Sequence, residues 1–192
     1  MADLLTQSWQ LAHGAIPTGV ARAGNVIGGG DRAKRRLVPD LLNALQRGTR
    51  INLRYPEATR PWQHVLDCLS GYLTCLRGLG ETLEDDVWNI GPLEATSISV
   101  LRIAEDLSRA LGQDNLFTTF PEETVHEERR LHLNSEKIRK SLGWFDVLAV
   151  GDSVSWTAEW EGLCLRGEDA LKATQDQVSK FLSLEHPPLF FG

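Results

Sequence analysis

A run of glycines after a short apolar segment constrains this chain more than any other feature. Gly24 and the consecutive Gly28, Gly29 and Gly30 follow the partly apolar segment 16–22, which predicts a buried strand. Glycine allows positive φ and a close approach of the backbone to a ligand. In open α/β sheets, ligands bind beyond the carboxyl ends of strands. The stretch therefore predicts either a ligand-binding loop or a plain turn, and its spacing is not the G-x-G-x-x-G dinucleotide fingerprint.

A second stretch carries side chains suited to an anion. Arg54, Arg60 and Trp62 lie close together around two prolines. Arginine keeps its charge and presents a planar fork that matches phosphate oxygens. Upstream, Asn25 offers both donors and an acceptor at the end of the predicted strand. Trp62 either faces a base or sugar or packs in the core, and Arg60 either binds a phosphate or makes a surface ion pair.

Two charged segments leave alternatives open. Four of the five residues in 32–36 are cations, which could hold a diphosphate or could form the solvated start of a helix. In the segment 122–130, His126 and its neighbouring glutamates could hold a metal ion. No repeated ligand spacing supports this, so a surface loop is the simpler interpretation and no metal ligand is predicted.

The composition limits the class of protein. With 192 residues the chain is long enough for one domain with a sizeable core. A net charge of −6 argues against general affinity for nucleic acid. No run of about 18 apolar residues predicts a membrane-spanning helix. The three cysteines, Cys68, Cys75 and Cys164, form no Cys-x-x-Cys pair, which predicts reduced thiols in a cytoplasmic protein, with Cys68 and Cys75 in the core.

Hydrophobic periodicity predicts a mixed α/β fold. Helices are expected over 2–13, 37–47, 67–79, from a cap at Thr96 or Ser97 to about 111, 135–142, 153–165 and 168–184. Short strands are expected over 51–54, 62–65, 87–90, 115–120 and 130–133. In the third helix, Leu69, Leu73 and Leu76 share one face. The acidic segment 81–86 predicts a solvated connection, and 187–192 forms an apolar tail.

In order and spacing, these motifs resemble the extended short-chain dehydrogenase/reductase superfamily, and within it most nearly the CDP-glucose 4,6-dehydratases. The motifs span roughly residues 2–165 and lie at 2–8, 21–31, 36–40, 60–65, 69–73, 88–92, 126–127 and 142–144. The resemblance implies the carboxyl-terminal portion of an extended Rossmann-type α/β fold, with few short strands and about seven helices. It also implies a substrate-binding part, 1–166, followed by an additional helix and tail, 167–192.

The resemblance further implies a ligand and the residues that bind it. The family acts on nucleotide sugars with bound NAD, so a CDP-glucose-like substrate is expected. The substrate-binding positions, carried over residue by residue, are Asn25, Arg54, Arg60, Trp62, His126 and Glu127. Ala23 and Gly24 match positions near the nicotinamide of the complete enzyme. The chain departs from the family at Arg32, where tryptophan is usual, and at Arg35, where an acidic residue is usual.

The family's catalytic base has no counterpart in this sequence. The resemblance implies a Tyr-x-x-x-Lys pair, but Tyr55 and Tyr72 are followed four residues later by Thr59 and Leu76. The expectation is a truncated relative of an NAD-dependent lyase that is inactive alone and does not bind NAD by itself. The alternatives are a non-catalytic nucleotide-sugar-binding module and a protein-interaction module. Such a chain would form a homodimer or pair with a missing amino-terminal half.

Overall fold

The structure is a computed structural model of the chain. It describes residues 2–13, 16–79, 86–93, 98–114, 116–119 and 130–185. Three of the expectations from sequence lie outside these residues: the acidic connection at 81–86 except for Asp86, the pair at 126–127 and the tail at 187–192.

Seven helices are present in the described part of the chain, which confirms the expected fold class. They are α1 (Ala2–Ala12), α2 (Leu37–Arg47), α3 (Val65–Arg77), α4 (Val100–Ala110), α5 (Glu136–Leu142), α6 (Val150–Leu165) and α7 (Ala170–Leu182). Helix α2 has the predicted bounds, because Gly48 takes a left-handed conformation (φ 62°) that stops it. None of the helices described is long and apolar enough to cross a membrane.

The strands are short and form four pairs within the described residues. They are β1 (Val20–Ala23), β2 (Asn25–Ile27), β3 (Ile51–Asn52), β4 (Thr59–Arg60), β5 (Trp62–His64), β6 (Val87–Ile90), β7 (Ile98–Ser99) and β8 (Phe117–Thr118). The pairs β1–β6, β2–β5 and β3–β8 are parallel, and β4–β7 is antiparallel. Two expectations are corrected: the strand expected over 16–22 begins at Val20, and 130–133 makes only a single bridge, from Arg130 to Thr59.

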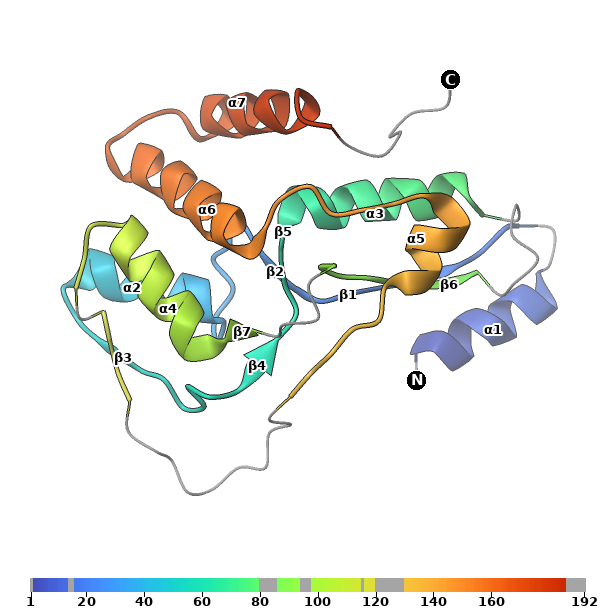
Figure 1. Ribbon diagram of the computed structural model, residues 1–192, viewed down its shortest axis with the longest axis horizontal. Helices are drawn as coiled ribbons and strands as arrows, with labels where there is room; N and C mark the ends of the chain where they lie inside the picture. The colour runs from blue at the N-terminus through green and yellow to red at the C-terminus, as the bar shows by residue number, and fades with distance from the viewer. Residues whose placement is uncertain are drawn as a thin grey trace.

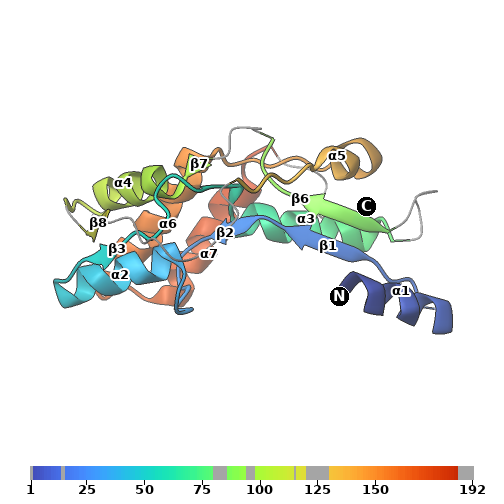
Figure 2. The same ribbon diagram turned by 90° about the horizontal axis from the view of Figure 1, so that it is seen from below.

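The molecule is elongated, with two groups of elements at opposite ends (Figures 1 and 2). Helices α2, α4 and α6 gather at one end, and α7 packs on α6 (Figure 1). Strands β1 and β6 lie at the other end with α1 and α5 (Figure 2). Helix α3 runs between the two ends, and the β2–β5 pair lies near the middle (Figure 1). The two paired strands therefore connect the groups.

The largest hydrophobic cluster joins the helices of the first end. Leu41 of α2, Leu107 of α4 and Val154 of α6 are buried in it, and Ile27 and Trp62 extend it to β2 and β5. Because burial of apolar surface is the main favourable term in folding, these contacts fix the two strands to the helices. The residues at the strand ends are thereby held in place for a site.

Helix α4 begins at a different cap from the one expected. Its N-cap is Ser99, whose Oγ accepts a hydrogen bond from the backbone N–H of Arg102 at 3.2 Å. Ser99 is also the last residue of β7, which pairs with β4. Since the backbone is extended through this pairing, the helix starts only after it, and the prediction of a cap at Thr96 or Ser97 is wrong.

Helix α3 buries a polar face and leaves its leucines exposed. Leu69, Leu73 and Leu76 are 48%, 45% and 62% exposed. On the buried face, the hydroxyl of Ser70 accepts a hydrogen bond from Nε1 of Trp144 at 2.9 Å. The periodicity therefore identified a true helix face, but the described core packs against the opposite one.

Helix α7, which lies beyond the resemblance, packs on α6. Phe181 is buried in a cluster with Trp156. Nε2 of Gln177 donates to the Trp156 carbonyl at 2.7 Å, and Nε1 of Trp160 donates to Thr174 Oγ1 at 2.9 Å. The two helices thus form a unit through both apolar and polar contacts.

Candidate functional site

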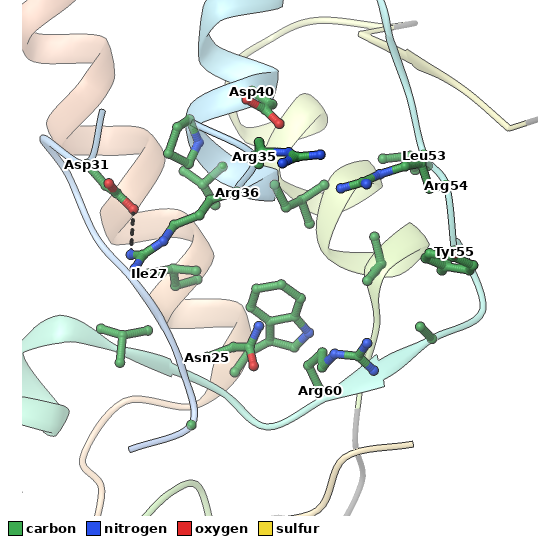
Figure 3. Close-up of a pocket in the computed structure, with 18 of the residues that line it drawn as sticks. Asn25, Ile27, Asp31, Arg35, Arg36, Asp40, Leu53, Arg54, Tyr55 and Arg60 are labelled. Atoms are coloured by element: carbon green, nitrogen blue, oxygen red, sulfur yellow. Dashed lines mark hydrogen bonds and ion pairs between the residues drawn. The ribbon is translucent and has the colours of Figure 1, made fainter. Parts of the chain in front are cut away.

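A cavity of about 550 Å³ opens between the end of β1, β2, the first turn of α2 and the segment after β3 (Figure 3). Its wall includes all six of the residues that were expected from sequence to bind ligand or cofactor and that the structure describes. They are Ala23, Gly24, Asn25, Arg54, Arg60 and Trp62. The structure therefore brings together residues from two segments that the sequence analysis connected only through resemblance.

Asn25 lies in a strand and not in a loop. It is the first residue of β2, opposite Trp62 of β5, and its backbone N–H donates to the Pro61 carbonyl at 2.8 Å. This corrects the expectation that the first strand runs directly into a glycine loop. The side chain of Asn25 lies at the cavity (Figure 3), where its amide offers donors and an acceptor to a bound polar group.

Arg60 and Trp62 form the inner part of the wall. Arg60 is only 8% exposed, and its Nη1 donates to the Thr59 carbonyl at 2.8 Å. The indole of Trp62 is buried in the main core, with Nε1 donating to the Ile98 carbonyl at 3.0 Å. Trp62 thus serves the core and the cavity wall at once, and its polar atom already has a protein partner.

The glycine loop, residues 28–30, is held by hydrogen bonds to a buried carboxylate of α6. Glu161 is 1% exposed, and its Oε1 accepts from the Gly30 backbone N–H at 2.8 Å. Arg32 donates to both carboxylate oxygens, at 2.7 and 2.9 Å. This hydrogen-bonded pairing raises the pKa of Arg32. Arg32 is therefore engaged by Glu161, and the other cations of the segment are the ones placed to meet a ligand.

The structure leaves no room for a side chain at Gly29 of this loop. A Cβ atom at Gly29 would lie 2.2 Å from the Trp160 ring. The glycines at this position thus permit the loop to pack against an indole of α6, which is a structural reason and not a ligand contact. The sequence pattern identified the close approach correctly, but the neighbour is part of the same chain.

Two other cations of the segment 32–36, Arg35 and Arg36, lie at the cavity. Oδ1 of Asp31 accepts from the Ala33 N–H at 2.9 Å, and Arg36 donates to Oδ2 of Asp31 at 3.3 Å. Arg35 and Arg36 both line the cavity, whereas Lys34 does not. The four cations could not be told apart from sequence, since spacing alone does not show which of them face a common space.

The wall of the cavity is positively charged. Four arginines line it, at 35, 36, 54 and 60, against two aspartates, Asp31 and Asp40. The first turn of α2 also borders it, and its N-cap, Arg36, makes no side-chain capping hydrogen bond. The first N–H groups of a helix have no partner within the helix and attract anions. Charge and backbone therefore both favour an anionic ligand.

Two residues at the cavity, Ala23 and Gly24, are the described ones that sequence predicts to lie near a nicotinamide. Ala23 and Gly24 lie at the cavity, at the end of β1. A Cβ atom at Gly24 would lie 2.4 Å from the Pro61 carbonyl oxygen, so the absent side chain makes room for the protein's own backbone.

No cluster of three or more His, Cys, Asp or Glu suited to a metal ion occurs among the residues described. His126 and Glu127 lie outside them. Cys68 and Cys75 are buried free thiols, as the sequence predicts. Burial raises the pKa of Cys75 to about 12, which keeps this thiol protonated and unreactive.

Two buried titratable groups anchor the strand and helix behind the cavity. Nδ1 of His64, the N-cap of α3, accepts from the Leu66 N–H at 3.3 Å, and burial lowers the pKa of His64 to about 4. Asp67 accepts from the N–H groups of Val147 and Leu148, at 2.7 and 3.1 Å. Burial raises the pKa of Asp67 to about 6 despite these bonds. His64 is therefore neutral at pH 7.

Known proteins of similar sequence and fold are nucleotide-sugar enzymes. Residues 1–91 match the model of the NAD dependent epimerase/dehydratase family. The chain is 34% identical over 165 residues to CDP-glucose 4,6-dehydratase of Salmonella typhimurium, which covers 84% of this chain and 46% of the relative. The chain thus spans about half the length of the curated relatives it matches.

Several solved structures of similar fold are dehydratases and epimerases of nucleotide sugars. dTDP-glucose 4,6-dehydratase from Bacillus anthracis, in complex with NAD, is 20% identical with a TM-score of 0.65, over 83% of this chain and 48% of that one. UDP-glucuronic acid 4-epimerase from Bacillus cereus, in complex with UDP-glucuronic acid and NAD, is 17% identical with a TM-score of 0.69, over 84% and 50%. The fold is thus that of a Rossmann-type epimerase/dehydratase over about half its length. In sequence and fold the chain therefore resembles the NAD-dependent epimerase/dehydratase family of extended short-chain dehydrogenases/reductases, over about half the length of these enzymes.

Proposed function

We propose that this chain supplies the nucleotide-sugar-binding part of a 4,6-dehydratase, a lyase, with a CDP-glucose-like substrate. The observation that carries the proposal is the cavity, where arginines from three separate segments meet beside an uncapped helix terminus. A nucleoside diphosphate sugar carries two adjacent negative charges, and this wall complements them. The similarity to the Salmonella CDP-glucose enzyme supports CDP as the nucleotide.

The roles proposed for the cavity residues follow from their positions. Arg60, largely buried on β4, binds one phosphate, and Arg54 binds the same diphosphate from the segment after β3. Asn25 hydrogen-bonds the sugar diphosphate, and Trp62 forms the apolar wall beside the nucleoside. His126 and Glu127 remain proposed substrate ligands from the family resemblance.

We propose that the redox chemistry belongs to the part of the related enzymes that this sequence does not match. NAD, when bound, supplies the hydride acceptor, and Ala23 and Gly24 border its nicotinamide in the proposal. The sequence contains no Tyr-x-x-x-Lys pair to remove the hydroxyl proton. We therefore infer that the chain corresponds to the carboxyl-terminal part of the enzyme, that turnover requires the complementary part, and that this chain alone does not bind NAD.

Two further features belong to the proposal. Residues 1–166 form the substrate-binding part, and 167–192 an addition that carries α7. A reducing compartment, the cytoplasm, is supported by the buried free thiols Cys68 and Cys75.

Calorimetric titration of the chain with CDP-glucose tests the function. We expect saturable binding, and a loss of about 10- to 100-fold in affinity for Arg60→Ala, because a hydrogen bond between charged groups contributes about 1.5–3 kcal/mol. Arg47→Ala is the matched control, since Arg47 is exposed at the end of α2 and does not line the cavity. Titration with NAD alone is expected to give no heat.

Two results would contradict this function. One is a folded chain that gives no heat with CDP-glucose. The other is an equal loss of affinity in Arg60→Ala and Arg47→Ala, which would indicate a general effect of charge and not a contact in the cavity.

The exposed leucines of α3 favour a second function, protein association. Leu69, Leu73 and Leu76 form one stripe with Tyr72, which is 40% exposed and also lines the cavity. Such a stripe normally covers a core. Because the chain matches about half of its relatives, the partner we propose is a polypeptide equivalent to their unmatched part. It would cover the stripe at the border of the cavity.

Coexpression tests this association. The part of the Salmonella CDP-glucose 4,6-dehydratase that this chain does not match is the partner, and light scattering measures the complex. We expect a one-to-one complex that the double variant Leu73→Glu, Leu76→Glu abolishes, because two buried carboxylates are costly. Leu171→Glu on α7, which is 65% exposed, is the control. Association unchanged by the double variant, or a homodimer of this chain that survives it, would contradict the proposed surface.

A further inference from the structure

We infer that Arg35 is a specificity-determining residue that, with Arg54, selects a nucleoside diphosphate over a monophosphate in the cavity. This inference rests on the proposed nucleotide-binding function and adds to it a residue at which the family resemblance does not predict a cation. Arg35 lines the cavity, and in Figure 3 its guanidinium group points toward that of Arg54.

The chain places Arg35 through a tightly bonded turn. Glu161 holds Gly30 and Arg32 on one side of the turn. Asp31 holds the Ala33 N–H and the Arg36 side chain on the other. The remaining members of the cationic segment are thereby occupied or turned away, and Arg35 is the one directed into the cavity without an ion pair.

The backbone of Arg35 is in a conformation that arginine disfavours. Its φ is 65°, and it is the one non-glycine residue with positive φ among those described. Residues with a Cβ atom occupy this region at a cost, and such strain persists where the surrounding structure imposes it, often at ligand sites. Glycine would occupy the position without strain. An arginine there is explained by what its side chain binds.

Asp31 and Asp40 also line the cavity, but neither is ion-paired with Arg35 or Arg54 among the residues described. Neither Arg35 nor Arg54 makes an ion pair or hydrogen bond within the described ranges of the chain. Two guanidinium groups directed toward each other repel, and an anion between them removes the repulsion. A second phosphate supplies that anion, because a diphosphate places two charged groups within reach of separate arginines. A monophosphate satisfies the Arg60 contact and leaves the second pair of cations unbound.

The test compares CDP and CMP as ligands in calorimetry, with thermal unfolding measured on the same samples. For Arg35→Gly we expect a rise of about 2–4 °C in Tm from relief of the φ strain. We also expect a loss of about 10-fold in affinity for CDP and at most about 2-fold for CMP. If Arg35 had only a structural role, its replacement would not raise Tm while weakening the binding of CDP alone. Lys34→Glu is the control for charge, since Lys34 is adjacent but outside the cavity.

The outcomes separate this inference from the proposed function. If Arg60→Ala weakens CDP binding but Arg35→Gly does not, the nucleotide site stands and the role of Arg35 is overturned. Equal losses for CDP and CMP in Arg35→Gly, or an equal loss of CDP binding in Lys34→Glu, also overturn it. If the unaltered chain binds neither nucleotide, both the inference and the proposed function fail.

Discussion

Gly29→Ala is expected to destabilise the protein by about 3 kcal/mol or more, which lowers Tm by roughly 6–12 °C in a chain of this size. The added Cβ would lie 2.2 Å from one atom of the Trp160 ring and 2.3 Å from another. The ring cannot easily retreat, because it is buried and its Nε1 donates to Thr174 of α7. Thermal or urea unfolding measures the effect.

Gly151→Ala is the matched control for this substitution. Gly151 lies in α6, and a Cβ there meets nothing within 4 Å. Alanine is the better helix former by about 1 kcal/mol, so this variant is expected to gain stability. If Gly29→Ala unfolded at the same temperature as the unaltered chain, the packing of the glycine loop against Trp160 would be refuted. Addition of Trp160→Ala to Gly29→Ala should remove most of the clash.

The second large effect is a pair of opposite pH dependences at His64 and Asp67. The pKa of His64 is about 4 in the folded chain against 6.5 unfolded, so its contribution to stability is present above pH 6.5 and is lost as pH falls toward 4. The pKa of Asp67 is about 6 against 3.8 unfolded, so its contribution is greatest below pH 3.8 and is lost as pH rises toward 6. Each change amounts to about 3 kcal/mol, and the two nearly cancel.

Single substitutions should expose the two slopes. His64→Asn keeps an acceptor for the Leu66 N–H. Its free energy of unfolding, relative to that of the unaltered chain, should fall as pH rises from 4 to 6. Asp67→Asn should show the opposite, a rise with pH over the same range. Urea unfolding at a series of pH values, expressed as the difference from the unaltered chain, removes the titration of other groups. If this difference stayed constant with pH for both variants, the pKa of neither buried group would be shifted in the folded chain.

Local patterns determined the elements that could be predicted. Helix α2 has the predicted bounds because Leu41 and Leu42 repeat with helical period and Gly48 stops it. Strand β6 also has its predicted bounds. Both signals reside within a few residues of the element. That Asn25, Arg60 and Trp62 lie together could be predicted only from family resemblance. Their proximity depends on the β2–β5 pairing, which no local pattern indicates.

Features set by distant partners could not be predicted. The leucine stripe of α3 has normal helical periodicity, yet nothing local reveals that Ser70 on the other face is buried beneath Trp144. The four cations at 32–36 look equivalent in sequence. They differ because Glu161 pairs with Arg32 and Asp31 pairs with Arg36, which leaves Arg35 as the cation at the cavity without an ion pair among the described residues.

The Gly30–Glu161 hydrogen bond has a consequence for how the protein is made. Its two residues are 131 positions apart. During synthesis the glycine loop leaves the ribosome long before α6 exists, so the carboxylate that accepts its hydrogen bond is made late. Closing such a long segment carries an entropic cost. The hydrogen bond that holds this wall of the cavity can therefore form only after Glu161 has been synthesised. A nascent chain that stops short of α6 would display an open loop, with its glycines accessible to chaperones and proteases.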